Sequence, residues 1–269
     1  MVRAYPLRAR AGIAVFLLIA FGVPWTGWIV FRSTKVPSAT LEELTLFWLP
    51  AACSLAGAIA SFVEGGTRGL RTFAARVFSL RFSWYVLALA VMLPFIAGGI
   101  TFFTHPGDLL RGGVPRLALL GGIATFLANI WTGPVAEEFG WRGYLLPKFA
   151  ERWSPNVAGL VIGFIWTLWH LPLFYDSAFA TAPSTIKFLA TTTAWSVTLA
   201  LLVSRAHGSI LPSILAHWAI NSQALVFHAL LPKVPHDNLP GGWGFCVASS
   251  IVAALLAWFW RDVRWEPRR

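Results

Sequence analysis

Charged residues are scarce in this sequence. Only 12% of the 269 residues are Asp, Glu, Lys or Arg, whereas soluble domains average about 25%. Apolar residues make up 57% of the chain, and the mean hydropathy is +0.67. So little charge combined with many long apolar runs excludes an ordinary soluble domain and predicts an integral membrane protein.

Cysteine and several familiar protease motifs are scarce or missing. The two cysteines, Cys53 and Cys246, lie in separate apolar segments without CxxC spacing, so we expect small buried thiols and no disulfide. There is no HExxH sequence, which leaves a zincin-type metalloprotease without support. Neither GxSxG nor a pair of intramembrane aspartates is present, because Asp176 and Asp237 both fall in predicted loops. These absences disfavour serine-type and aspartyl-type intramembrane proteases.

The basic residues are unevenly distributed. The net charge is +10. This charge does not indicate nucleic-acid binding, because polytopic membrane proteins hold Lys and Arg against the cytoplasmic leaflet. With the N-terminus inside, 14 Lys and Arg fall in inner segments and 6 in outer loops. This asymmetry predicts an N-in and C-in topology with an even number of spans. Together with the short loops and the compact polytopic form, this topology suggests a bacterial inner or plasma membrane.

Eight apolar segments are long enough to span a bilayer, which takes about 20 residues. They run approximately over residues 12–31, 45–63, 84–103, 116–146, 156–174, 186–204, 209–230 and 243–260. The first is too long for a signal peptide, so we expect it to be retained. The sequence therefore predicts an all-α, polytopic membrane helix bundle of about eight transmembrane helices, forming one integral membrane domain over residues 1–269.

One linker has a pattern of its own. Within residues 68–81, Leu70, Phe73, Val77 and Leu80 recur at helical spacing, and arginines are interleaved between them. This pattern predicts a basic amphipathic helix lying in the inner membrane interface. A plain basic loop is the alternative.

The fourth apolar segment contains three charged residues within six positions. Each costs roughly 2.5 to 3.5 kcal/mol to insert at mid-membrane. Glu138 and Arg142 are four residues apart on one helix face and are expected to pair. Glu137 is turned by about 100° from that pair, so it is the unpaired carboxylate and a candidate general base. The alternative is a purely structural ion pair, or a helix end at the interface.

Two further polar pairs lie on predicted helices. Trp166 and His170 share one face of the fifth segment, and His217 and Asn221 share one face of the seventh. At 1.5 Å per residue, these residues and Glu137 lie roughly 12–21 Å from the inner end, which predicts that they converge. The remaining histidines are expected to be solvated or interfacial, namely His105, His207, His228 and His236.

These motifs resemble a known family. They are Glu137-Glu138-x-x-x-Arg142, Trp166-x-x-x-His170 and His217-x-x-x-Asn221, in that order. In this order they are similar to the CPBP family, the type II CAAX prenyl endopeptidases and bacteriocin-processing-like (Abi) intramembrane proteases. The resemblance covers a core of about residues 117–230. Trp166 is a departure, because the family more often has Phe at this position.

The resemblance implies an intramembrane endopeptidase. Glu137 and His170 would activate a water molecule, and His217 and Asn221 would donate to the oxyanion. Three residues would support the site, namely Glu138, Arg142 and Trp166. The active site would face the cytoplasmic side.

The cofactor, partners and activity are each open to alternatives. A Zn²⁺ ion held by Glu137, His170 and His217 is possible in principle. The metal-free mechanism is preferred, because Asn221 suits an oxyanion donor better than a zinc ligand. The expected partners are the lipid bilayer and a peptide or membrane-protein substrate, and nothing in the sequence identifies a prenyl group. The rival functions are a non-catalytic scaffold or immunity protein of the same fold and a transporter, although no inverted repeat supports the latter.

Overall fold

A computed structural model describes residues 5–34, 48–103, 127, 129–230 and 242–266. These residues form helices and contain no strand, which confirms the all-α prediction for this part of the chain. The longer helices are α1 (Leu7–Thr34), α3 (Leu49–Val77), α4 (Trp84–Phe103), α8 (Pro155–Trp169), α9 (Ala182–Arg205), α10 (Leu211–Leu230) and α11 (Trp243–Phe259). Within the described residues, α1, α3 and α9 are long and apolar enough to cross a membrane. The total of eight spans remains a prediction.

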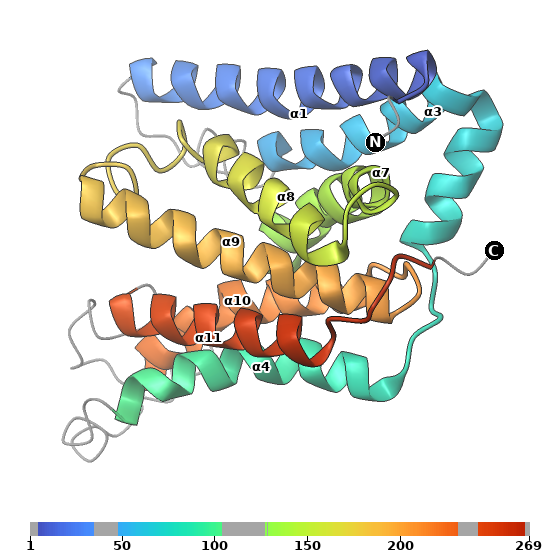
Figure 1. Ribbon diagram of the computed structural model, residues 1–269. Helices are drawn as coiled ribbons and strands as arrows, with labels where there is room; N and C mark the ends of the chain where they lie inside the picture. Colours follow the sequence, from blue (N-terminus) through green and yellow to red (C-terminus); the bar gives the residue numbers. More distant parts are fainter. Residues whose placement is uncertain (1–4, 35–47, 104–126, 128, 231–241, 267–269) are drawn as a thin grey trace.

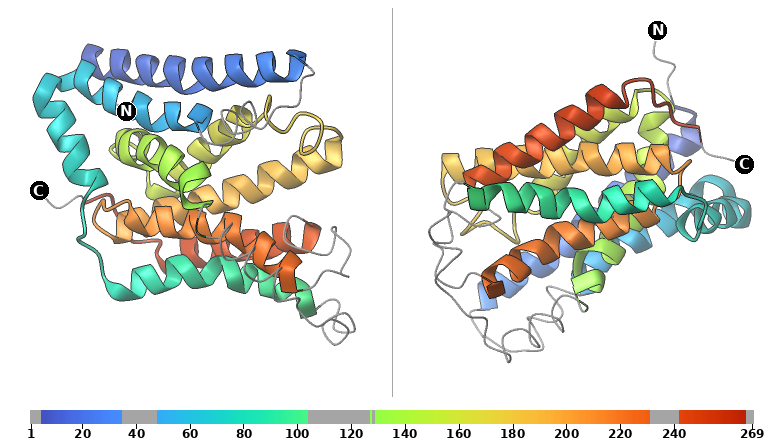
Figure 2. Two further views of the ribbon diagram at one scale, coloured as in Figure 1. Left: turned by 180° about the vertical axis from the view of Figure 1, so that it is seen from behind. Right: turned by 90° about the horizontal axis from the view of Figure 1, so that it is seen from below.

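The two ends of the chain lie at the same end of the bundle. In Figure 1, α1 begins and α11 ends on the right, and the junctions between α7 and α8 and between α9 and α10 lie at this end too. The views in Figure 2 agree with this arrangement. An even number of crossings produces this placement, as the N-in and C-in prediction requires. Which end faces the cytoplasm remains a prediction.

Helix α3 is broken near its middle. Gly66 has a φ of 58°, a left-handed conformation that glycine adopts at little cost. A Cβ on Gly69 would meet the carbonyl oxygen of Ser61, so the chain on the two sides of the break runs very close together. The second half of α3 then crosses the end of the bundle (Figure 1), which is the orientation expected of an interfacial helix.

This second half is the predicted amphipathic linker. It is helical to Val77, with Phe73 and Val77 buried and Arg71 exposed. The plain-loop alternative is therefore wrong for this part. The predicted helix was too long, however, because the chain leaves the helix at Phe78 and Leu80 is exposed.

The helix that carries the two glutamates departs from regular α-helical geometry. It consists of π-helix η2 (Trp131–Val135), α6 (Ala136–Glu138), π-helix η3 (Phe139–Leu145) and α7 (Leu146–Ala150). The two widened segments thus flank the glutamates on both sides, and π-bulges of this kind are frequent at functional sites. The sequence pattern predicted a helix here but no π-helical segments.

Side chains from α3 hold this irregular helix in place. Three of its carbonyl oxygens accept hydrogen bonds, from Ser54 Oγ to Val135 (2.9 Å), from Cys53 Sγ to Glu137 (3.6 Å) and from Arg76 Nη1 to Gly143 (2.7 Å). Gly140 allows the close approach, since a Cβ there would collide with the Cys53 backbone. These contacts fix the glutamates relative to α3.

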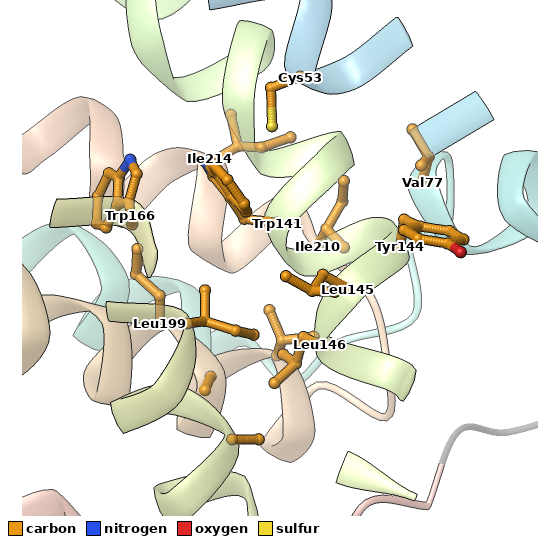
Figure 3. Packing of buried hydrophobic residues seen from close by; sticks show 14 of the residues in the cluster. Cys53, Val77, Trp141, Tyr144, Leu145, Leu146, Trp166, Leu199, Ile210 and Ile214 are labelled. Carbon is orange, nitrogen blue, oxygen red and sulfur yellow. The ribbon is translucent and has the colours of Figure 1, made fainter. Parts of the chain in front are cut away.

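Large apolar side chains anchor the same helix on its other faces. Trp141, Leu145 and Leu146 are each completely buried. Figure 3 shows these three side chains packed among Ile210, Ile214 and Leu199. The glutamate-bearing helix therefore lies in the main hydrophobic core, so that its polar residues are shielded from the surroundings.

Candidate active site

A buried ion pair with a histidine attached forms one side of the site. Glu138 Oε1 accepts hydrogen bonds from Arg142 Nη1 at 2.8 Å and from His217 Nδ1 at 2.9 Å. The Glu138 and Arg142 side chains are only 0% and 1% exposed. The pairing expected from the i,i+4 spacing is therefore present. The sequence did not indicate that Glu138 also binds His217.

The bond from His217 to Glu138 determines how the imidazole is presented. A carboxylate oxygen accepts, so Nδ1 carries the proton in this contact. In a neutral imidazole, Nε2 is then the nitrogen with the free lone pair. Glu138 therefore directs Nε2 of His217 away from the ion pair and toward Gly133, where Glu137 Oε1 also lies.

Glu137 points its two carboxylate oxygens at different groups. Oε2 accepts a hydrogen bond of 2.5 Å from the indole Nε1 of Trp166. Oε1 lies beside Gly133, 3.3 Å from the point where a Cβ on that glycine would lie. Only one oxygen of this buried carboxylate is held by an indole, so the other remains available for chemistry.

Three polar groups converge on Gly133. The point where a Cβ on Gly133 would lie is 2.9 Å from Asn221 Nδ2, 3.2 Å from His217 Nε2 and 3.3 Å from Glu137 Oε1. The polar atoms come from two separate segments, η2–α6 and α10. The convergence predicted from helix depth is thus found for Glu137, His217 and Asn221.

Gly133 was not identified from the sequence. It stands four residues before Glu137, one turn back on the same helix, and this spacing was the signal available for finding it. Three other residues were also missed, namely Cys53, Ser54 and Arg76. Their contribution depends on α3 packing against the glutamate-bearing helix, which no spacing within one segment reveals.

Trp166 connects the parts of the site. Its ring lies 4.7 Å below the guanidinium carbon of Arg142 and makes an edge contact with the His217 ring at 5.1 Å. The sequence predicted only an aromatic support at this position. The structure adds the indole N–H, which a phenylalanine lacks.

His170 lies at the edge of the group. Helix α8 ends at Trp169, earlier than the predicted boundary at residue 174, so His170 caps the helix rather than standing within it. Its Nδ1 donates to the carbonyl of Trp166 at 2.8 Å, and its ring stacks on Phe174 at 5.4 Å. The hydrogen bond described for His170 thus goes to the backbone of its own helix and does not involve Glu137.

The zinc alternative is not supported by the arrangement of these side chains. Among the described residues, no three His, Cys, Asp or Glu side chains come together in a way that could hold a metal ion. Glu137, His170 and His217 do not form such a group among these residues, and the metal-free mechanism remains a prediction.

The structure describes some of the remaining histidines and both cysteines. His207 lies in the turn after α9 with a φ of 53°. His228 is in α10, but its side chain lies outside the described part, as do His105 and His236 altogether. Cys53 and Cys246 are free and buried, as predicted.

Comparison with known proteins supports the motif-based resemblance. Residues 119–223 match the family described as type II CAAX prenyl endopeptidase Rce1-like. A segment of 101 residues is 35% identical to CAAX prenyl protease 2 of Methanococcus maripaludis, covering 37% of this chain and 33% of that protein. Both comparisons relate this segment to peptidases, and the resemblance is confirmed over it. The match spans about a third of the relative's length.

Proposed function

We propose that this protein is a CAAX-protease-like intramembrane endopeptidase. The observation that carries the proposal is the convergence of Glu137 Oε1, His217 Nε2 and Asn221 Nδ2 on one point beside Gly133. The similarity of residues 119–223 to a peptidase family supports it independently. A carboxylate, an imidazole and an amide brought close together at one glycine are groups that can support peptide hydrolysis by an activated water.

In the proposed reaction, Glu137 acts as the general base. A water oxygen bonds to the scissile carbonyl carbon, one water proton passes to Glu137, and the carbonyl π electrons move to oxygen. The C–N bond then breaks, and Glu137 returns the proton to the leaving nitrogen. His170 helps Glu137 to orient the water. Asn221 Nδ2 donates to the developing oxyanion, and His217 Nε2 does so when the imidazole carries a proton on both nitrogens.

The buried ion pair supports these groups without taking part in bond changes. Glu138 and Arg142 fix the helix that carries Glu137, and Glu138 orients His217 through Nδ1. Trp166 holds the second oxygen of Glu137. The reacting carboxylate is therefore positioned before substrate arrives, which reduces the reorganisation needed during the reaction.

The proposed substrates are peptides or membrane-protein segments that reach the site from the bilayer. The proposed location is a bacterial inner or plasma membrane, with the active site toward the cytoplasmic side. The relative from Methanococcus maripaludis is named a CAAX prenyl protease, so prenylated CAAX peptides are a substrate class to test. Nothing among the described side chains selects a prenyl group over other apolar chains.

The test is cleavage of a reporter peptide library by the purified protein in detergent or nanodiscs. Prenylated and unprenylated peptides are compared. Wild type is expected to cleave at defined bonds, whereas Glu137→Gln and His217→Ala are expected to lose at least 100-fold in kcat/KM. Asp262→Asn is the matched control, because the Asp262 side chain is 92% exposed and follows α11, a helix that carries no residue of the site.

Two outcomes would overturn the proposal. If wild type cleaves no peptide, a scaffold or immunity protein becomes the better interpretation. If the Glu137 and His217 variants cleave like wild type, any activity arises elsewhere. A chelator arm accompanies the assay. Because the proposed mechanism uses no metal, activity is expected to survive a chelator and metal-free buffer, and loss of activity that Zn²⁺ restores would contradict the mechanism.

A further inference from the structure

A polar cavity lies where helix α3 is broken, at the end of the bundle that carries both termini (Figure 1). Its volume is about 300 Å³, at the lower end of the range of small-molecule sites, about 300–1,000 Å³. Arg68 and Arg76 from the second half of α3 line it, together with Glu64 before the break and Lys148 and Glu151 from α7 and its C-terminal end. The described lining includes none of the candidate catalytic residues, so the proposed reaction gives this cavity no role.

Two of the charges in the lining neutralise each other. Glu64 Oε2 forms an ion pair with Lys148 Nζ, and Glu64 Oε1 accepts a hydrogen bond of 2.5 Å from the Tyr144 hydroxyl. Both oxygens of this carboxylate are therefore engaged, and the side chains of the pair are only 14% and 21% exposed. Glu64 and Lys148 thus form a neutral part of the cavity wall.

Three charged groups of the lining remain, namely Arg68, Arg76 and Glu151. In the part of the chain that the structure describes, none of them forms an ion pair. Arg76 Nη1 donates to the carbonyl of Gly143 at 2.7 Å, which uses one of the five N–H donors of a guanidinium. Arg68 and Glu151 are exposed. The cavity therefore offers two guanidinium groups and one carboxylate to a ligand that carries both signs of charge.

An apolar strip on α3 leads to this cavity. Leu55, Ile59 and Phe62 are all exposed and recur at i, i+4 and i+7, so they share one face of the helix. Gly65, which follows one turn later, belongs to the cavity lining. Since α3 is long and apolar enough to cross a membrane, this strip suits contact with acyl chains. A soluble phosphate would have no use for it, whereas a phospholipid would occupy both the strip and the cavity.

We propose that the cavity binds the headgroup of an aminophospholipid of the phosphatidylethanolamine type. The phosphate lies between Arg68 and Arg76, because guanidinium groups bind phosphate oxygens through paired N–H donors. The ammonium group lies toward Glu151, and the acyl chains follow the strip formed by Leu55, Ile59 and Phe62. Basic pockets at a membrane surface are known to take lipid headgroups. Lipid binding here is independent of the proposed peptidase reaction and goes beyond it.

The test is a lipid titration of the delipidated, purified protein in detergent, followed by native mass spectrometry. The probes are phosphatidylethanolamine and phosphatidylglycerol of equal, short acyl-chain length, and inorganic phosphate. Wild type is expected to bind one phosphatidylethanolamine saturably, with a Kd at least about threefold below that of phosphatidylglycerol. Absence of saturable lipid binding would overturn the proposal. Inorganic phosphate bound as tightly as the lipid would show a site for free anions and would overturn the lipid assignment.

Two arginine variants locate the binding site. Arg68→Gln removes a guanidinium from the cavity lining, and we expect the Kd for phosphatidylethanolamine to rise at least about tenfold. Arg71→Gln is the matched control, because Arg71 is exposed on the same half of α3 and does not line the cavity. Its Kd is expected to stay within about twofold of wild type. Both arginines are exposed, so folding should not suffer. Equal losses in the two variants would indicate a general basic surface, and the site would be wrong.

A third variant tests the contact with the ammonium group. Glu151→Gln removes the negative charge of an exposed side chain, so the preference for phosphatidylethanolamine over phosphatidylglycerol is expected to disappear. A variant that keeps the wild-type preference would contradict the aminophospholipid assignment. No arm of this experiment measures peptide cleavage, so its failure would leave the proposed peptidase function untouched, and failure of that function would leave the lipid site untouched.

Discussion

Replacing Glu138 with Gln removes one negative charge from the interior with little change in shape. Both contacts of Glu138 are made by Oε1, whereas Oε2 is buried without a hydrogen-bond partner. The amide nitrogen of Gln can therefore occupy the Oε2 position, and the amide oxygen can still accept from Arg142 and His217. Glu138→Gln is thus close to a pure deletion of charge.

The expected cost follows from burial. Arg142 is 1% exposed and Glu138 0%, so the variant leaves a guanidinium charge inside without its partner. Removing one partner of a buried pair costs about 3–5 kcal/mol, and we expect the lower end because the hydrogen bonds persist. For a chain of this size that corresponds to a fall in Tm on the order of 5–10 °C. The kcat is also expected to fall, because His217 loses the anion beside Nδ1.

Thermal unfolding of the purified protein in one detergent measures this effect. The control is Asp176→Asn, which breaks an ion pair with Arg32 of similar length (2.7 Å) but with Asp176 77% exposed. Exposed pairs contribute at most about 1 kcal/mol. In the double variant Glu138→Gln with Arg142→Gln, the loss of Tm should be smaller than the sum of the two single losses.

The reasoning is refuted if Glu138→Gln lowers Tm no more than Asp176→Asn does. It is also refuted if the double variant loses as much as both single variants together. Either result would mean that the two side chains are not an ionised, mutually compensating pair.

Two further predictions concern the same site. Trp166→Phe removes the N–H that donates to Glu137 Oε2. A hydrogen bond to a charged group contributes about 1.5–3 kcal/mol, so kcat is expected to fall at least tenfold with little change in KM. Trp195→Phe removes a buried N–H that has no partner and should leave kcat unchanged, so equal kcat values in the two variants would contradict this role of Trp166. Gly140→Ala places a Cβ against the Cys53 backbone, so overpacking should cost about 1–3 kcal/mol in thermal unfolding, whereas an unchanged Tm would show that α3 can move away freely.

Much of the fold could be predicted because hydrophobic segments and helical spacing are local properties. The predicted segment over residues 84–103 matches α4 (Trp84–Phe103), and the one over residues 243–260 ends within a residue of α11. Boundaries set by tertiary contacts were less accurate. Helix α8 stops at Trp169 because His170 caps it, and α3 continues to Val77 because its second half packs Phe73 and Val77 on the core.

Part of the candidate site could also be predicted from local sequence patterns. Spacing within one helix paired Glu138 with Arg142 and left Glu137 unpaired, and the ion pair is present at 2.8 Å. Approximate depth brought His217 and Asn221 to the level of Glu137. The contact between His217 and Glu138 joins residues 79 positions apart, so it depends on how α10 is rotated, and depth along a helix carries no information about rotation.

The sequence by itself determined that this chain is an all-helical protein with the composition of a membrane protein, and which polar residues its helices carry inside. It did so because the length of an apolar segment and the i,i+4 spacing of polar residues are properties of short, continuous stretches of chain. Only the tertiary structure decided that Glu137, His217 and Asn221 meet at Gly133, that Trp166 holds one carboxylate oxygen, and that Glu138 binds both Arg142 and His217. Each of these depends on the rotation and close approach of helices distant in the sequence, which packing of the whole bundle sets.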